Sequence, residues 1–196
     1  MKEFKSQRRL QKISKVVKSR QFTLQVVLEN IHDSHNVSAI FRTCDAVGVP
    51  KVSLIYYLEK FPKIGKKSSA SAFKWVEKEK FSSVSECYDS LRKSGYTIYA
   101  STISDEANDL YKLDFKKKIA IVFGNEHRGA SDEAAKLADK KFKIPMYGMV
   151  QSLNVSVAAA IVLYEALRQR MKKGFYAKSE LNESALEELI EKWARK

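Results

Sequence analysis

A long apolar segment constrains what this chain can fold into more than any other feature. From Val155 to Leu167 nearly every position is apolar, and the consecutive alanines at 158–160 keep one side thin. Ser152 and Asn154 precede it and are candidate helix caps, because their side chains accept hydrogen bonds from unpaired backbone N–H groups. A helix that is apolar on nearly every face is buried on more than one side. We therefore expect this helix in a deep core or a subunit interface.

Segments typical of strands alternate with segments typical of helices along the chain. The predicted strands are Thr23–Glu29, Val52–Tyr57, Trp75–Glu79, Tyr96–Thr102, Ile119–Phe123 and Lys141–Ile144. The predicted helices are residues 2–18, Val37–Val47, Ser82–Lys93, Asp132–Ala138, Val155–Leu167 and residues 181–195. This alternation predicts an α/β fold with a mostly parallel sheet and helices on both faces. The 196 residues fit one domain, with the basic N-terminal helix and the C-terminal helix as extensions.

Positive charge is concentrated in three parts of the sequence. There are 36 Lys and Arg against 23 Asp and Glu, a net charge of +13. The clusters lie at residues 1–20, 60–80 and 168–178. Clustered cations attract phosphate backbones by releasing counterions, so the pattern favours nucleic acid over a merely solubilising surface. The candidate contacts to nucleic acid are Arg8, Arg9, Arg20 and Arg168.

Several classes of protein are disfavoured by what the sequence lacks. No window approaches the ~18 uninterrupted apolar residues of a membrane span, and no apolar core of a signal peptide is present. Cys44 and Cys87 lie at apolar helical positions, which predicts buried, reduced thiols in a cytoplasmic protein. The three histidines have no accompanying carboxylate or cysteine cluster, so no metal site is expected.

Two features point to ligand binding without identifying the ligand. The segment from Gly124 to Gly129 directly follows a buried strand, where glycine allows close approach of the backbone to a ligand; an ordinary turn is the alternative. It is not a phosphate-binding P-loop, because no Gly-Lys-Ser/Thr follows. Arg42 lies in the helix after the first strand, where open α/β sheets place ligand-facing groups, although many such arginines are surface residues.

Three segments, in order, match a known family. They read NIHDSHNVSAIFRTCDAVGV at residues 30–49, IVFGNEHRGAS at residues 121–131 and IPMYGMVQSLNVSVAAAIVLYEALRQR at residues 144–170. Together they resemble the TrmH branch of the SPOUT methyltransferases. The resemblance covers nearly the whole chain, and the third segment is its most specific part.

The resemblance implies a 2′-O-methyltransferase that uses S-adenosylmethionine on the ribose of RNA, without a metal. The expected substrate is tRNA, with guanosine 18 as the expected position. It also implies a homodimer and a trefoil knot in the C-terminal half, with the cofactor in loops 100–103, 123–129 and 144–154. The implied cofactor-binding residues are Ser101, Thr102, Gly124, Asn125, Glu126, Gly129, Ile144, Met146 and Leu153.

The catalytic residues implied by the resemblance are Arg42, Asn36, Ser152 and Asn154. Arginine is too basic to act readily as a general base. We therefore interpret Arg42 as a bidentate clamp on the phosphate of the target nucleotide, which lowers the pKa of the ribose hydroxyl and fixes its position. Asn36 would orient Arg42 or the ribose, and the other two residues would shape the pocket.

Alternatives remain at this stage. The same core could methylate another tRNA or rRNA position, but only about 20 residues precede the first strand here, and related rRNA enzymes usually carry an extra N-terminal RNA-binding domain. That difference favours tRNA. A non-catalytic RNA-binding protein on the same scaffold is a second possibility. A nucleotide-binding α/β protein of another type would need a phosphate motif that this chain lacks.

Overall fold

The computed structural model describes residues 6–58, 60–62, 72–104, 106–125 and 129–196. The helices are α1 (Gln7–Lys18), α2 (Ser34–Val47), α3 (Ala72–Trp75), α4 (Val84–Lys93), α5 (Asp132–Leu137), α6 (Val155–Lys172) and α7 (Glu183–Ala194), with a 3-10 turn η1 (Leu110–Lys112). The strands are β1 (Leu24–Glu29), β2 (Lys51–Ile55), β3 (Glu77–Phe81), β4 (Thr97–Ser101), β5 (Asn108–Asp109), β6 (Ile119–Phe123) and β7 (Lys140–Lys143).

The described strands form one sheet in the order β3-β2-β1-β6-β4-β7-β5, and every pairing between them is parallel. Val26 of β1 is in register with Val52 of β2 on one side and with Ile121 of β6 on the other. The predicted parallel sheet is confirmed. Because the strands are parallel, the loops after β1, β4, β6 and β7 emerge at one edge, which we call the carboxyl edge.

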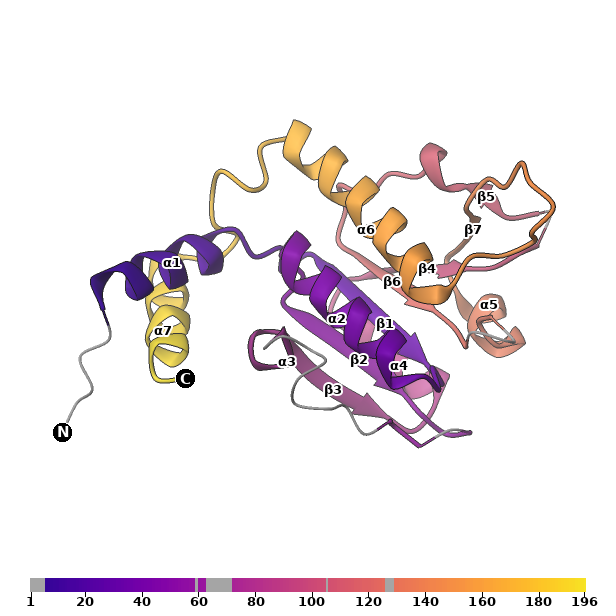
Figure 1. Ribbon diagram of the computed structural model, residues 1–196, viewed down its shortest axis with the longest axis horizontal. Helices are drawn as coiled ribbons and strands as arrows, with labels where there is room; N and C mark the ends of the chain where they lie inside the picture. The colour runs from indigo at the N-terminus through magenta and orange to yellow at the C-terminus, as the bar shows by residue number, and fades with distance from the viewer. Residues whose placement is uncertain (1–5, 59, 63–71, 105, 126–128) are drawn as a thin grey trace.

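Helices cover both faces of the sheet, as predicted (Figure 1). Successive side chains of β1 point to opposite faces of the sheet. Val26 and Leu28 pack against α2 and α6 on one face, and Val27 packs against α4 and α5 on the other. All six residues of β1 are buried, as are all five of β6. The central strands are therefore almost entirely apolar because neither of their faces meets water.

Local capping chemistry sets where the helices begin and end. The Asp33 side chain accepts a hydrogen bond from the His35 N–H at 2.8 Å and starts α2. Gly48 ends that helix in the left-handed conformation, with φ 85°, which glycine adopts without strain. Ser83 caps α4, as the sequence predicted. Of the two candidate caps for α6, Asn154 makes the hydrogen bonds.

Two predictions about the elements are only partly right. The strand predicted at Trp75–Glu79 is present but shifted, because α3 ends at Trp75 and strand β3 spans Glu77–Phe81. In β3 charged residues alternate along an edge strand, a pattern that apolar periodicity does not detect. Helix α6 is buried on one side only within a single chain, so it does not lie in a deep core, and its expected place in a subunit interface stays a prediction. Val157, Tyr164 and Met171 are 47%, 53% and 59% exposed.

Helices α1 and α7 pack side by side beside the body of the molecule (Figure 1). Ile13 and Val17 of α1 meet Trp193 of α7 in a small apolar cluster. The Trp193 ring lies 4.8 Å from the ring of Trp75, which ties this helix pair to α3. No helix in the described ranges has the length and apolar character that crossing a bilayer requires. The expected trefoil knot stays a prediction.

Candidate active site

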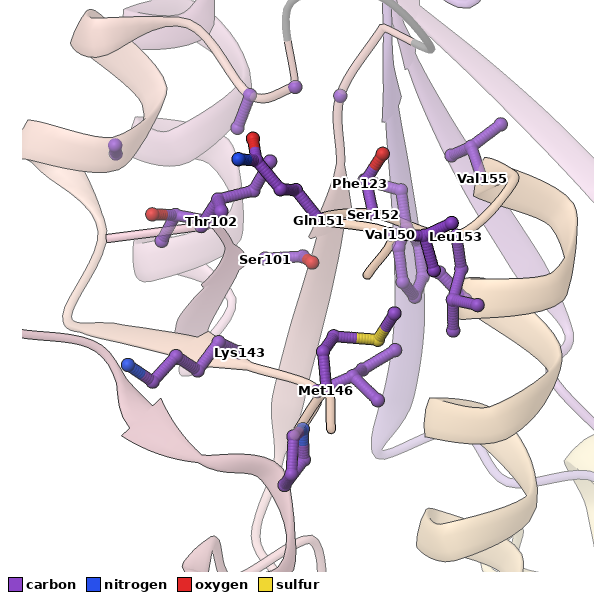
Figure 2. A pocket seen from close by; sticks show the side chains of 18 of the residues that line it. Ser101, Thr102, Phe123, Lys143, Met146, Val150, Gln151, Ser152, Leu153 and Val155 are labelled. Carbon is purple, nitrogen blue, oxygen red and sulfur yellow. The ribbon is translucent and has the colours of Figure 1, made fainter. Parts of the chain in front are cut away.

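A cavity of about 880 Å³ lies at the carboxyl edge of the sheet, where the loops after β4, β6 and β7 meet. Eight of the nine residues implied as cofactor contacts line it. They are Ser101, Thr102, Gly124, Asn125, Gly129, Ile144, Met146 and Leu153. The ninth, Glu126, lies outside the described residues. Figure 2 shows side chains from these separate loops around one space, with Leu153 from the loop before α6 and Val155 from the first turn of that helix.

The cavity also has lining residues that the sequence analysis did not single out. Asp109, Asp132 and Lys143 contribute charged groups, and Gln151 contributes an amide. Lys143 is the last residue of β7, so its position at a strand end was a usable signal. Asp109 belongs to a two-residue strand that no periodic pattern reveals. The lining therefore combines apolar side chains with a few polar groups, as small-molecule sites generally do.

Among the described residues, Asn125, Gly129 and Ala130 form the wall of the cavity after β6. The Asn125 N–H donates to the Gly129 carbonyl at 2.9 Å, and the Gly129 N–H donates back to the Asn125 carbonyl at 2.7 Å. A Cβ atom at Gly124 would overlap the backbone of Gly129 and Ala130. Gly129 itself has φ 71°, in the left-handed region. Glycine is thus required at both positions, at the first for space and at the second for backbone conformation.

Asn36 and Asn154 meet at the start of α6, 118 positions apart in sequence. The Asn154 side-chain nitrogen donates to the Asn36 side-chain oxygen at 3.0 Å. The Asn154 oxygen accepts from the Ser156 N–H at 2.8 Å and from the Val157 N–H at 3.4 Å. Both ends of the Asn154 amide are therefore held, and the contact fixes the orientation of the Asn36 amide. Ser152 lines the cavity two residues earlier.

Arg42 is exposed on α2 and does not line the cavity of its own chain. It lies six positions after Asn36, which places it roughly 9 Å farther along the helix axis and on a different side. The single chain thus brings together Asn36, Ser152 and Asn154 but leaves Arg42 apart from them. Of the four predicted catalytic residues, only Ser152 lines this cavity, and a site that joins all four stays a prediction.

The four predicted RNA contacts differ in their surroundings. Arg8 and Arg9 are exposed on α1. The Arg168 side chain is 53% exposed, and its guanidinium donates two hydrogen bonds of 2.7 Å to Glu165. That hydrogen bonding by Arg168 lowers the pKa of the Glu165 carboxyl.

Arg20 is buried, so its prediction as an RNA contact is wrong. It is 1% exposed and forms an ion pair with Asp45. It also donates to the Val49 carbonyl at 3.2 Å and lies over the Trp193 ring at 5.0 Å. These partners lie far from Arg20 in sequence, and a guanidinium enclosed by them is unavailable to a phosphate.

The cavity suits a ligand that has both an apolar and a charged part. Its volume lies within the range of small-molecule sites, and its carboxylates at Asp109 and Asp132 can attract a cationic group. Among the described residues, no three His, Cys, Asp or Glu side chains gather as a metal site would require. A sulfonium cofactor with an adenosine moiety fits this lining.

Comparison with known proteins identifies the family. Residues 23–164 match the model of the SpoU rRNA Methylase family. The chain is 42% identical over 192 residues to a tRNA (guanosine(18)-2′-O)-methyltransferase of Thermus thermophilus, covering 98% of each protein.

Solved structures agree. The TrmH/SpoU tRNA modifying enzyme of A. aeolicus aligns with a TM-score of 0.90 at 41% identity, over 96% of this chain and 95% of that one. The SpoU methyltransferase AviRb of Streptomyces viridochromogenes, solved in complex with AdoMet, aligns with a TM-score of 0.68 at 25% identity, over 79% of this chain and 62% of that one. This chain belongs to the SpoU methylase family.

Proposed function

We propose that this protein methylates the ribose 2′-hydroxyl of guanosine 18 in tRNA, with S-adenosylmethionine as the methyl donor. One observation carries the proposal: residues from three separate strand ends, implied as cofactor contacts by sequence, converge on one cavity. Membership in the SpoU family and the relatives that act on guanosine 18 of tRNA support the same activity.

The cofactor site is assigned to the cavity wall formed by the loops after β4, β6 and β7. Thr102, Asn125 and Leu153 represent the three loops. When bound, S-adenosylmethionine supplies an electrophilic methyl group on a sulfonium leaving group. The protein must then hold the 2′-oxygen about 3–3.5 Å from that carbon, in line with the bond that breaks.

Asn36, Ser152 and Asn154 are assigned to the ribose side of the site. The Asn154 amide is already held by the first turn of α6 and by Asn36, so it is preorganised. Preorganised donors stabilise developing charge without further reorganisation during the reaction. Arg42 supplies a guanidinium that can hold a phosphate next to the target in bidentate fashion.

We assign the assembled enzyme as a homodimer, built on the exposed apolar face of α6 and the loop before it. Val157 and Tyr164 on α6 are 47% and 53% exposed, and Met149 and Val150 in the loop are 100% and 62% exposed. Exposed apolar side chains in one region typically mark an interface. Sedimentation at micromolar protein tests this; a stable monomer would contradict it.

The dimer also resolves the separation of Arg42 from the cavity, because a second copy can supply this residue. Mixing Arg42→Ala chains with Gly124→Val chains tests the idea. Each variant alone lacks one half of every site, but a mixed dimer retains one complete site. Random exchange restores about a quarter of wild-type activity in a symmetric dimer. No restoration in verified mixed dimers would place Arg42 in the site of its own chain.

The RNA contact is assigned to the exposed basic residues of α1, with Arg8 and Arg9 as its centre. Arg168 is a further candidate on α6, next to its carboxylate partner. A reducing, cytoplasmic compartment is proposed from the two buried free cysteines. Burial raises the pKa of Cys87 to about 12, so this thiol stays protonated and unreactive.

The decisive experiment incubates the protein with an unmodified tRNA transcript and labelled S-adenosylmethionine, then maps the labelled nucleoside. Label at guanosine 18 is expected. A transcript with 2′-deoxyguanosine at position 18 is the matched control and should take up no label, since it lacks the accepting oxygen. Equal labelling of both transcripts would place the methylated nucleotide at another position of the tRNA. Labelling of rRNA but not of tRNA would identify rRNA as the substrate instead.

A further inference from the structure

The last residue of β1, Glu29, and the residue after it, Asn30, are polar, buried and outside the cavity lining. Glu29 is 2% exposed and Asn30 is 3% exposed. Neither belongs to the residues assigned above to the cofactor, the ribose or the RNA. A buried carboxylate is costly unless several donors satisfy it, so its partners indicate what it does.

Both oxygens of Glu29 accept hydrogen bonds from other loops. One accepts from the Tyr57 hydroxyl at 3.0 Å, after β2. The other accepts from the Ser131 N–H at 2.9 Å, after β6. Burial, together with the nearby Glu29 carboxylate, raises the pKa of Tyr57, so its hydroxyl remains a donor at neutral pH. The carboxylate therefore joins two loops through donors only.

Asn30 joins the same loops through different atoms. Its side-chain oxygen accepts from the N–H groups of Tyr57 and Leu58 at 3.2 and 3.1 Å. Its carbonyl accepts from the Asn125 side-chain nitrogen at 2.6 Å. The backbone here has φ 48°, the left-handed region. A residue other than glycine costs about 1 kcal/mol there, and asparagine tolerates the region best.

These contacts hold the cavity wall after β6 at both of its ends. Asn125 begins that wall and is held by Asn30, whereas Ser131 follows it and is held by Glu29. Gly129 and Ala130 lie between the two anchors and line the cavity. Movement of either anchor would shift backbone that faces the cofactor.

We propose that Glu29 and Asn30 are positioning residues that set the shape of the cofactor pocket by anchoring Asn125 and Ser131, at the two ends of the cavity wall after β6, to the end of β1. This inference rests on the proposed function, since it assigns the pocket to S-adenosylmethionine. It concerns two residues that do not line the cavity. They act through the backbone of the wall.

The test compares Glu29→Ala with Gln25→Ala. Gln25 lies four residues earlier on the same strand and is also buried; its side chain donates to the Ser53 hydroxyl at 2.7 Å, away from the cavity. Calorimetry measures the affinity for S-adenosylmethionine, and thermal unfolding measures stability. Glu29→Ala should weaken cofactor binding about tenfold at temperatures where it remains folded, whereas Gln25→Ala should leave it within about twofold.

Two conservative variants sharpen this test. Glu29→Gln should restore affinity nearly to wild type, because its amide oxygen can accept from the Ser131 N–H while its nitrogen donates to the Tyr57 oxygen. Tyr57→Phe removes only one of the two bonds to Glu29 and should weaken cofactor binding about threefold. Tyr57→Phe keeps the test decisive should Glu29→Ala fail to fold, because the Tyr57 side chain is 41% exposed.

Hydrogen exchange at the Ser131 amide gives a readout that needs no cofactor. Exchange should be faster in Glu29→Ala than in Gln25→Ala. Equal exchange and equal affinity in these two variants would overturn the positioning role. A wild-type protein that binds no S-adenosylmethionine would instead overturn the proposed function, and the amide exchange would still decide whether Glu29 holds the wall.

Discussion

The two edges of the sheet differ in whether their charged and polar side chains are buried in internal hydrogen bonds or line a cavity. At the amino edge, where the strands begin, Arg170 is completely buried. It donates to the carbonyls of Phe115, Lys117 and Thr23 at 2.9, 2.7 and 3.1 Å and lies 3.6 Å from Glu180. At the carboxyl edge, polar groups line an open cavity. The amino edge is sealed by its own hydrogen bonds, and the carboxyl edge keeps space for ligands.

This contrast separates stability from function within one sheet. A buried guanidinium with carbonyl partners on several segments locks those segments together, and removing it leaves the carbonyls unpaired. Polar side chains that line a cavity can instead use part of their hydrogen-bonding capacity to bind a ligand. The comparison predicts that mutations at the amino edge change unfolding and that mutations at the carboxyl edge change binding or rate.

Arg170→Leu should have the largest effect on stability. It leaves several buried carbonyls and the Glu180 carboxylate without their partner, which costs about 3–5 kcal/mol of unfolding free energy. Lys172→Ala on the same helix is the control, since Lys172 is exposed and should change stability by less than about 0.5 kcal/mol. Urea unfolding measures both. Weakened cofactor binding in folded Arg170→Leu protein would show that the two edges are coupled.

Arg42→Ala should reduce the rate of methyl transfer at least about 10²-fold, because without the clamp on the phosphate the 2′-oxygen is no longer held in line with the methyl group. Thermal stability and cofactor affinity should stay at wild-type values, because the side chain is exposed. Arg42→Lys retains the charge but loses bidentate geometry, so its rate should fall between the rates of wild type and Arg42→Ala. Single-turnover kinetics give the measurement, and an unchanged rate in Arg42→Ala would remove this residue from the mechanism.

Asn154→Ala tests whether the residue that caps α6, next to the cavity, also contributes to the rate of methyl transfer. Asn154 begins α6 and also bonds Asn36, whereas Asn182 begins α7 and accepts from the Ala185 N–H at 2.9 Å. Loss of either cap should cost about 1 kcal/mol of stability. Only Asn154→Ala should also lower kcat, by about tenfold through the lost contact to Asn36. Equal kcat values for the two variants would leave Asn154 with a capping role alone.

The double variant Arg8→Ala, Arg9→Ala should have the smallest effect, confined to RNA affinity. Each lost phosphate contact should reduce the slope of log K against log salt concentration by about 0.7–0.9. Lys93→Ala, at an exposed lysine on α4, is the control and should leave the slope unchanged. Filter binding of tRNA over a salt series gives the slopes. Parallel slopes for wild type and the double variant would contradict the assignment of α1.

Much of the carboxyl edge was predictable because it depends on local patterns. Runs of apolar and β-branched residues predict the strand end at Phe123, and the end of β4 to within one residue, at Thr102 instead of Ser101. Parallel pairing then brings the loops after these strands to one edge. Asn154 was predictable as a cap because its side-chain oxygen accepts hydrogen bonds from the backbone N–H groups two and three residues later. The short strand that holds Asp109 was not, since two residues carry no periodicity.

The arginines show where local patterns stop being informative. Arg8 and Arg20 belong to one basic stretch of sequence, yet Arg8 is exposed and Arg20 is buried against Asp45 and Trp193. Arg42 was placed beside Asn36 by a shared motif, but helix geometry separates them within one chain. The burial of an arginine side chain and the identity of its ion-pair partner depend on residues distant in sequence. Neither could therefore be predicted from the residues next to it.

The sequence by itself determined most of the strands and helices and the parallel character of the sheet. These two properties arise from hydrophobic periodicity and capping, which act over a few residues. The loops of the cofactor site were predicted from the resemblance to a family. Only the tertiary structure decided that Arg20 and Arg170 are buried, that α6 leaves an apolar face exposed, and that Glu29 and Asn30 anchor the cavity wall. The reason is that desolvation and hydrogen-bond satisfaction are set by distant parts of the chain brought into contact on folding.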